Sequence, residues 1–184
     1  LMGIRRSRTT GLPLTHEAKG DFMDESTYAK RYDFDGGDKR TTLTLCRKAF
    51  YDDIKGNEVA YNIEDITTNN DWIAIIHADG NGLGQVVQAV GGKLDKYKEF
   101  SRNLDAATKA AARAAFCYIS EKYKFRPGKV VPIRPIVLGG DDFTAICRGD
   151  FAIDYTREFL KQFEHFTQEK LGEMIKEEKV FGKD

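Results

Sequence analysis

Residues 136–147 read Ile136-Val137-Leu138-Gly139-Gly140-Asp141-Asp142-Phe143-Thr144-Ala145-Ile146-Cys147, and this stretch decides the fold. Two apolar runs of strand length flank a short turn of glycine and aspartate, which are typical turn residues. The stretch therefore predicts a β-hairpin, with strands at 130–138 and 143–147. Pro132 and Pro135 each remove a backbone donor from the first strand, which places that strand at the edge of a sheet.

A further strand is predicted upstream, at residues 72–78, where the sequence reads Trp72-Ile73-Ala74-Ile75-Ile76-His77-Ala78. This run is apolar at both odd and even positions, which is typical of a central strand covered on both faces. Asp79 and a glycine-rich segment, residues 80–84, follow it directly. His77 is predicted to be a packed histidine rather than a catalytic base.

Apolar residues at three- and four-residue spacing predict a short helix at 85–90 and longer helices near 102–123 and 151–171. Ser101 and Asp150 are candidate N-caps of the two longer helices, which we expect to end near Gly128 and Gly172. We expect both long helices to pack on one face of the sheet. The element order is then β-α-β-β-α.

This order predicts an α+β domain at residues 71–184, with a ferredoxin-like βαββαβ unit whose final strand is missing from the sequence. Residues 1–70 are polar and interrupted by glycines, with one short β-like run at 42–46. Such a segment buries little apolar surface to offset its conformational entropy. We therefore expect residues 1–70 to form an irregular N-terminal extension.

The charge balance excludes a global attraction to nucleic acid or anionic lipid, because 29 Lys and Arg match 29 Asp and Glu. Arg5, Arg6 and Arg8 are interpreted as a solvated tail. The three cysteines lie far apart, which argues against a zinc knuckle or a disulfide framework. No apolar run reaches about 18 residues and no hydrophobic leader is present, so the sequence predicts a cytoplasmic protein without membrane partners.

Three carboxylates are predicted to converge at one edge of the sheet. Asp79 ends the first strand, while Asp141 and Asp142 lie in the hairpin turn. Like charges so placed repel one another unless a divalent cation neutralises them, and all-oxygen ligands suit Mg²⁺ or Mn²⁺. Two such ions about 3.5–4 Å apart clamp the attacking and leaving oxygens in phosphoryl transfer. Glycines permit close approach of a nucleotide, and the predicted nucleotide-binding residues are Gly80, Asn81, Gly82, Gly139 and Gly140.

The hairpin 138–143 and the segment 76–84 together resemble the GGDD palm of the large polymerase/cyclase subunit of type III CRISPR effector complexes. The resemblance covers residues 71–172. That family is related to GGDEF diguanylate cyclases and class III nucleotidyl cyclases, and it converts ATP into cyclic oligoadenylate messengers. The resemblance implies that Asp79, Asp141 and Asp142 hold two metal ions and that RNA-guided CRISPR effector subunits are partners.

The sequence departs from the full architecture of that family. It has no HD nuclease motif, no second palm and no zinc-binding cysteines, so it represents at most one catalytic half. Three functions stay open: a cyclic oligoadenylate synthase using ATP, a GGDEF-like diguanylate cyclase, or a non-catalytic nucleotide-binding palm that needs a second palm from a homodimer or a partner subunit. A calcium loop at 79–90 is excluded, because Leu83 and Val90 occupy ligand positions.

Overall fold

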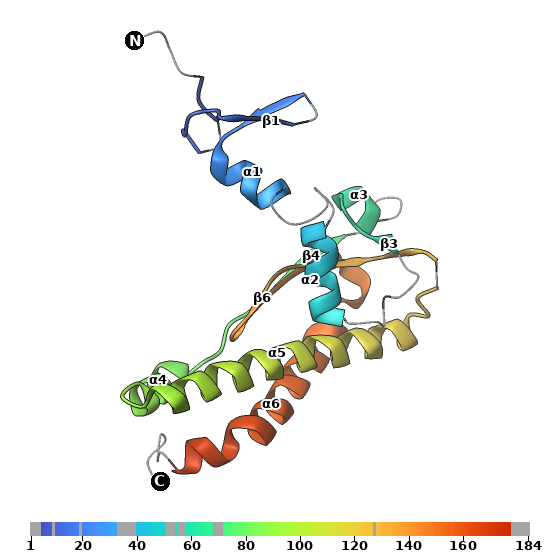
Figure 1. Cartoon of the computed structure of the whole chain (residues 1–184). Coiled ribbons are helices and arrows are strands. Elements are labelled where there is room, and N and C mark those ends of the chain that lie inside the picture. The colour runs from blue at the N-terminus through green and yellow to red at the C-terminus, as the bar shows by residue number, and fades with distance from the viewer. Residues whose placement is uncertain are drawn as a thin grey trace. The chain divides into compact units, whose positions relative to one another are not determined.

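The computed structural model describes residues 5–8, 10–18, 20–32, 40–50, 54, 58–67, 72–126 and 128–177 (Figure 1). The chain divides into two compact units, Leu1–Leu43 and Thr44–Asp184. The division therefore falls upstream of residue 70, where the composition of the sequence changes.

The first unit contains a small hairpin and a helix. Strand β1 (His16–Ala18) pairs antiparallel with β2 (Asp21–Met23), and α1 (Glu25–Tyr32) follows. Asp24 is buried between them and accepts hydrogen bonds from the Thr10 hydroxyl and from the hydroxyl and amide of Thr27. Burial alone raises the carboxyl pKa, but these hydrogen bonds outweigh it and hold the pKa of Asp24 well below its usual range.

The second unit has the predicted α+β composition, and its main elements follow the order β-α-β-β-α. Helix α2 spans the division between the units. The elements are α2 (Arg40–Phe50), β3 (Glu58–Val59), α3 (Ile63–Ile66), β4 (Ile73–Ala78), α4 (Leu83–Val90), α5 (Leu94–Lys122), β5 (Val130–Val131), β6 (Ile133–Gly139), β7 (Asp142–Arg148), a 3-10 turn (Gly149–Phe151) and α6 (Ala152–Glu177).

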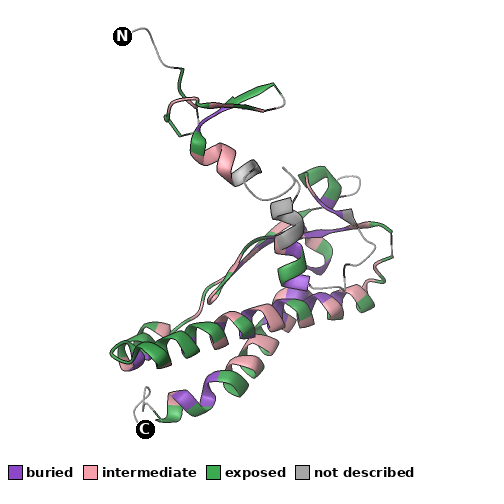
Figure 2. Cartoon of the chain, in the orientation of Figure 1, coloured by how far each residue is buried: buried purple, intermediate pink, exposed green. Residues whose placement is uncertain are grey.

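The sheet that carries the hairpin has the strand order β4-β7-β6 within the described residues, with β7 antiparallel to both neighbours. Phe143, Ala145 and Cys147 alternate along β7 and are fully buried. They face α5 and α6, which lie side by side on one side of the sheet (Figures 1 and 2). The prediction that both long helices cover one face is confirmed.

Two strand predictions need correction. Strand β4 is an edge strand rather than a central one, because the hairpin returns β7 between β4 and β6. The side chain of Ile75 is 73% exposed, since no described element covers that face of the sheet. Pro132 also divides the predicted 130–138 strand into β5, which pairs in parallel with β3, and β6. The edge position predicted for β6 is correct.

The helices are longer than their local signals predict. Helix α5 begins at Leu94, so Ser101 lies inside it, and α6 continues to Glu177 beyond Gly172. These extra turns are stabilised by tertiary packing, because the early part of α5, the late part of α6 and α4 share one apolar cluster. The buried members of this cluster are Val86, Val90, Phe100, Leu104, Leu171 and Met174.

Two other local predictions are wrong. Residues 42–46 belong to helix α2 rather than to a strand. Asp150 does not cap α6; it lies in the 3-10 turn, and its carboxylate accepts two 2.9 Å hydrogen bonds from the Arg148 guanidinium. In the part of the chain that the structure describes, no helix is long and apolar enough to cross a membrane.

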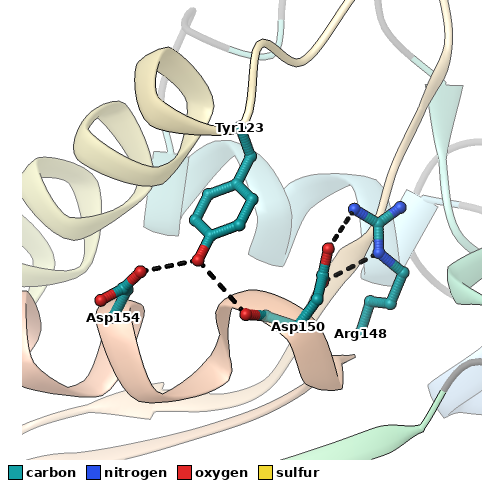
Figure 3. A network of polar contacts seen from close by, with 4 residues as sticks. All are labelled: Tyr123, Arg148, Asp150 and Asp154. Carbon is teal, nitrogen blue, oxygen red and sulfur yellow. Dashed lines mark hydrogen bonds and ion pairs between the residues drawn. The ribbon is translucent and has the colours of Figure 1, made fainter.

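A polar network joins the end of α5 to the start of α6 (Figure 3). The Tyr123 hydroxyl donates to the Asp154 carboxylate at 2.6 Å and lies 3.2 Å from the backbone carbonyl of Asp150. Lys122 also donates to Asp154, at 2.6 Å. The hydrogen bond from Lys122, followed by that from Tyr123, holds the pKa of Asp154 below its usual value.

Replacing Asp154 with asparagine removes its ion pair with Lys122 and is expected to lower the melting temperature at neutral pH. The expected change is only roughly 1–3 °C, because solvent-accessible ion pairs contribute little to stability. The lowered pKa of Asp154 means that its contribution is fully present above the unfolded-state pKa of about 4 and is lost as pH falls through the folded-state pKa. Melting curves of both proteins between neutral and acidic pH test this. Glu169→Gln, a change at an exposed residue of the same helix, is the control. A difference in melting temperature between the unchanged protein and Asp154→Asn that persists at the most acidic pH would contradict a stabilising role for the ionised Asp154 carboxylate.

Candidate functional site

The candidate site lies where β4 ends beside the β6–β7 hairpin. Ala78 is paired with Phe143, and the same register continued by one residue places Asp79 opposite Asp142. Directly opposed residues of antiparallel strands have Cβ atoms about 4.5–5.5 Å apart. Both aspartates are exposed, so two carboxylates more than sixty residues apart in sequence meet at a solvent-accessible sheet edge.

Asp141 lies at the same end of the sheet, where it packs closely against Gly80. A Cβ atom placed on Gly80 would lie 2.8 Å from the Cβ atom of Asp141 and 2.6 Å from Cδ1 of Leu83, closer than Cβ contacts allow. The absence of a side chain at Gly80 therefore lets Asp141 pack against the backbone that directly follows Asp79. The requirement for glycine at this position comes from this close approach.

The remaining glycines leave space beside the carboxylates. A Cβ atom added to Gly139 or Gly140 would meet no atom within 4 Å. Gly140 has a φ of +60° and Gly82, the N-cap of α4, has a φ of +77°, so both adopt the left-handed conformation that favours glycine. All five predicted nucleotide-binding residues, Gly80, Asn81, Gly82, Gly139 and Gly140, flank this end of the sheet.

In the described part of the chain, the predicted convergence of three carboxylates on one metal position is not found. Among the described residues, no group of three His, Cys, Asp or Glu side chains is close enough to hold one metal ion. The donor chemistry nevertheless fits Mg²⁺ or Mn²⁺, because carboxylates from two separate chain segments lie at the same end of the sheet. Asp79, Asp141 and Asp142 are the residues that would hold such ions.

His77 lies one residue before the site and differs from its prediction. Its side chain is exposed rather than packed, and its Nδ1 atom lies 2.8 Å from the Thr144 hydroxyl on the neighbouring strand. His77 is paired with Thr144 in the strand register, so this contact joins β4 to β7 on the exposed face of the sheet.

Thr108 connects the long helix α5 to the hairpin tip. Its hydroxyl is fully buried and lies 2.5 Å from the carbonyl oxygen of Gly140 and 3.1 Å from that of Leu104. The shorter contact holds the turn that precedes Asp141 and Asp142. In the sequence, Thr108 falls on the apolar stripe that predicts the helix near 102–123, and that pattern assigns its hydroxyl no role. The available signal was a hydroxyl at a core position, because a buried hydroxyl requires a hydrogen-bond partner.

Replacing Thr108 with valine is expected to lower the free energy of unfolding by about 1 kcal/mol, because the Gly140 carbonyl loses a hydrogen bond while the side-chain volume is kept. Thr108→Ser retains the hydroxyl and serves as the matched control. Urea denaturation of the three proteins measures the effect. A valine variant as stable as the unchanged protein would show that this hydrogen bond does not stabilise the turn, while Thr108→Ser measures the separate cost of losing the buried methyl group.

Comparison with known proteins agrees with this geometry. A family model described as the second palm domain of Cas10/Cmr2 matches residues 72–179, which include β4, the β6–β7 hairpin and α6. A search of curated proteins finds no significant match. The matched region exceeds half of the chain and contains both motifs that carry the resemblance to the type III CRISPR large subunit. The chain therefore belongs to the Cas10/Cmr2 family, and the GGDD hairpin lies within its second palm domain.

Proposed function

We propose that this palm is a nucleotidyltransferase that joins ATP into cyclic oligoadenylates, with Mg²⁺ or Mn²⁺ held by Asp79, Asp141 and Asp142. Membership in the Cas10/Cmr2 family supports a nucleotide polymerase or cyclase in general. The observation that carries the proposal is the meeting of the β4 terminus and the GGDD turn at one exposed edge. Ordinary packing does not require acidic residues of both segments at this end of the sheet.

Each part of the site has a role in this reaction. The ribose hydroxyl oxygen of one ATP bonds to the α-phosphorus of another, the bond from that phosphorus to the oxygen of the leaving pyrophosphate breaks, and the hydroxyl proton passes to water. Bound divalent cations supply charge neutralisation and lower the pKa of the attacking hydroxyl. The three aspartates hold that positive charge, while Gly139 and Gly140 leave room for the nucleotide. The N-terminus of α4, at Gly82, offers backbone N–H groups to phosphate oxygens.

A second candidate is a nucleotide-holding palm that becomes catalytic only with another palm. It is favoured because no group of three possible metal ligands forms within the described residues. The other palm would come from a second copy of the chain or from a partner subunit. Association with CRISPR effector subunits is part of the same proposal.

Incubation with ATP or GTP and manganese, followed by measurement of pyrophosphate and separation of the products, tests these candidates. We expect pyrophosphate and cyclic oligoadenylate from ATP, with ATP preferred over GTP. A product made only from GTP would instead identify a diguanylate cyclase. Nucleotide binding without pyrophosphate release, even at high protein concentration, would favour the non-catalytic palm. Activity that rises more steeply than protein concentration would show that two palms are needed.

A further inference from the structure

Three arginines near the start of the first unit are held in a defined loop. The Ser7 amide donates to the Leu12 carbonyl at 2.8 Å, and the Leu14 amide donates to the Arg5 carbonyl at 2.9 Å. Between these two hydrogen bonds, Arg6 and Pro13 are paired as an isolated antiparallel β-bridge. The three arginines are exposed, as their interpretation as a solvated segment predicts, but they belong to a hydrogen-bonded hairpin rather than to a free tail.

The tip of this hairpin is anchored to the body of the first unit. The Thr10 hydroxyl donates to the buried carboxylate of Asp24 at 2.8 Å, and the same carboxylate accepts from Thr27 in α1. The charge of Asp24 is therefore satisfied locally. Among the described residues, no carboxylate forms an ion pair with Arg5, Arg6 or Arg8, and the Arg6 guanidinium donates to the Gly11 carbonyl at 2.9 Å.

The arginines line a cleft of about 640 Å³ together with residues of β2 and α1. This volume lies within the range of about 300–1,000 Å³ that is typical of small-ligand sites. The cleft is predominantly polar, and Asp21 is its one acidic residue. It therefore has the charge and the size to receive phosphate groups.

An aromatic side chain adds a second kind of recognition. Phe22 lines the same cleft and is 50% exposed, so one edge of the cleft offers an aromatic surface. The Arg5 guanidinium carbon lies 5.0 Å from the centre of its ring. Stacked guanidinium and aromatic groups form platforms for unpaired bases, whereas the bases of a duplex are already stacked on one another.

We propose that this cleft binds single-stranded polynucleotide, with Arg5, Arg6 and Arg8 contacting phosphates and Phe22 stacking on a base. An acidic peptide would satisfy the arginines but would leave Phe22 exposed. The cleft lies outside the matched residues 72–179, so this inference does not rest on the proposed nucleotidyl transfer. The whole chain would then hold a polynucleotide through its first unit.

Fluorescence anisotropy of the full chain with a labelled twelve-nucleotide RNA tests the proposal. The double variant Arg5→Ala/Arg8→Ala is expected to weaken binding at least about tenfold and to reduce the slope of log K against log salt by about 1.4, since each phosphate contact contributes about 0.7. Phe22→Ala is expected to weaken binding by about tenfold without changing that slope. Arg47→Ala, an exposed arginine on α2, is the control and should bind as the unchanged protein does.

Three results would overturn the proposal. Unchanged affinity in the double arginine variant excludes the cleft as the site. Equal affinity for a twelve-base-pair duplex, with no effect of Phe22→Ala, indicates general attraction of polyanions. Competition by an acidic peptide as effective as competition by unlabelled RNA identifies the ligand as a peptide. Circular dichroism of each variant confirms that the chain is folded, and pyrophosphate release should be unaffected in all of them.

Discussion

Nucleotidyl transfer is expected to fall by about 100-fold or more when Asp79 is replaced with asparagine, or when Asp141 and Asp142 are both replaced with alanine. Each carboxylate supplies negative charge that holds the cations bridging the nucleotide phosphates, and removal of one leaves phosphate repulsion uncompensated. Pyrophosphate release at saturating ATP and manganese measures the loss. Asp105→Asn, on the helix α5 outside the site, is a control that should keep its activity.

The same variants should remain folded and be equally stable or slightly more stable without metal. The register of β4 and β7, continued by one residue, places Asp79 opposite Asp142, so we expect these carboxylates to repel one another in the metal-free protein. Melting temperatures measured with and without manganese plus nucleotide test this, because a ligand that binds only the folded state raises the melting temperature. The acidic cluster is scaffolding if the unchanged protein gains no stability from these ligands while the variants melt lower under every condition.

The largest effect on stability is expected from Phe143→Ala, which should lower the free energy of unfolding by about 3–5 kcal/mol. Phe143 is fully buried and stacks on Phe159 and Tyr155, with ring centres 4.8 and 5.7 Å away. Its removal leaves a cavity between the central strand and α6. Because Phe143 directly follows Asp142, this packing also holds the hairpin that carries the site.

Urea denaturation of Phe143→Ala beside Ile75→Ala measures this effect. Ile75 lies on β4 and its side chain is 73% exposed, so its replacement should change stability by no more than about 0.5 kcal/mol. A loss below about 1 kcal/mol in Phe143→Ala would show that the aromatic stack is not a principal source of stability for the hairpin.

The hairpin, the order of the main elements and the approach of the β4 terminus to the hairpin turn could be predicted from the sequence. These features depend on local chemistry: Gly139 and Gly140 with two aspartates form a turn, and apolar runs on either side form its strands. The antiparallel return of β7 beside β4 then places Asp79 near the turn. Two short motifs together were also sufficient to identify the family.

Tertiary packing decided the features that local signals predicted wrongly or missed. The alternating Thr and Leu residues at 42–45 match a strand, yet they form part of helix α2, whose end packs through Phe50 on Phe116 of α5. Helix α5 starts before Ser101 because its first turns share an apolar cluster with α4 and α6. Burial of a shared apolar face outweighs a favourable cap or a local propensity, each of which contributes about 1 kcal/mol.

Contacts between distant segments were equally outside the reach of the sequence. The hydrogen bond from Thr108 to Gly140 joins residues 32 positions apart, and the anchor from Thr10 to Asp24 holds the arginine hairpin against α1. The sequence determined which residue types were available and where the chain turns. The tertiary structure decided which polar groups meet, because buried hydroxyls and carboxylates are stabilised only by partners that folding brings within hydrogen-bond distance.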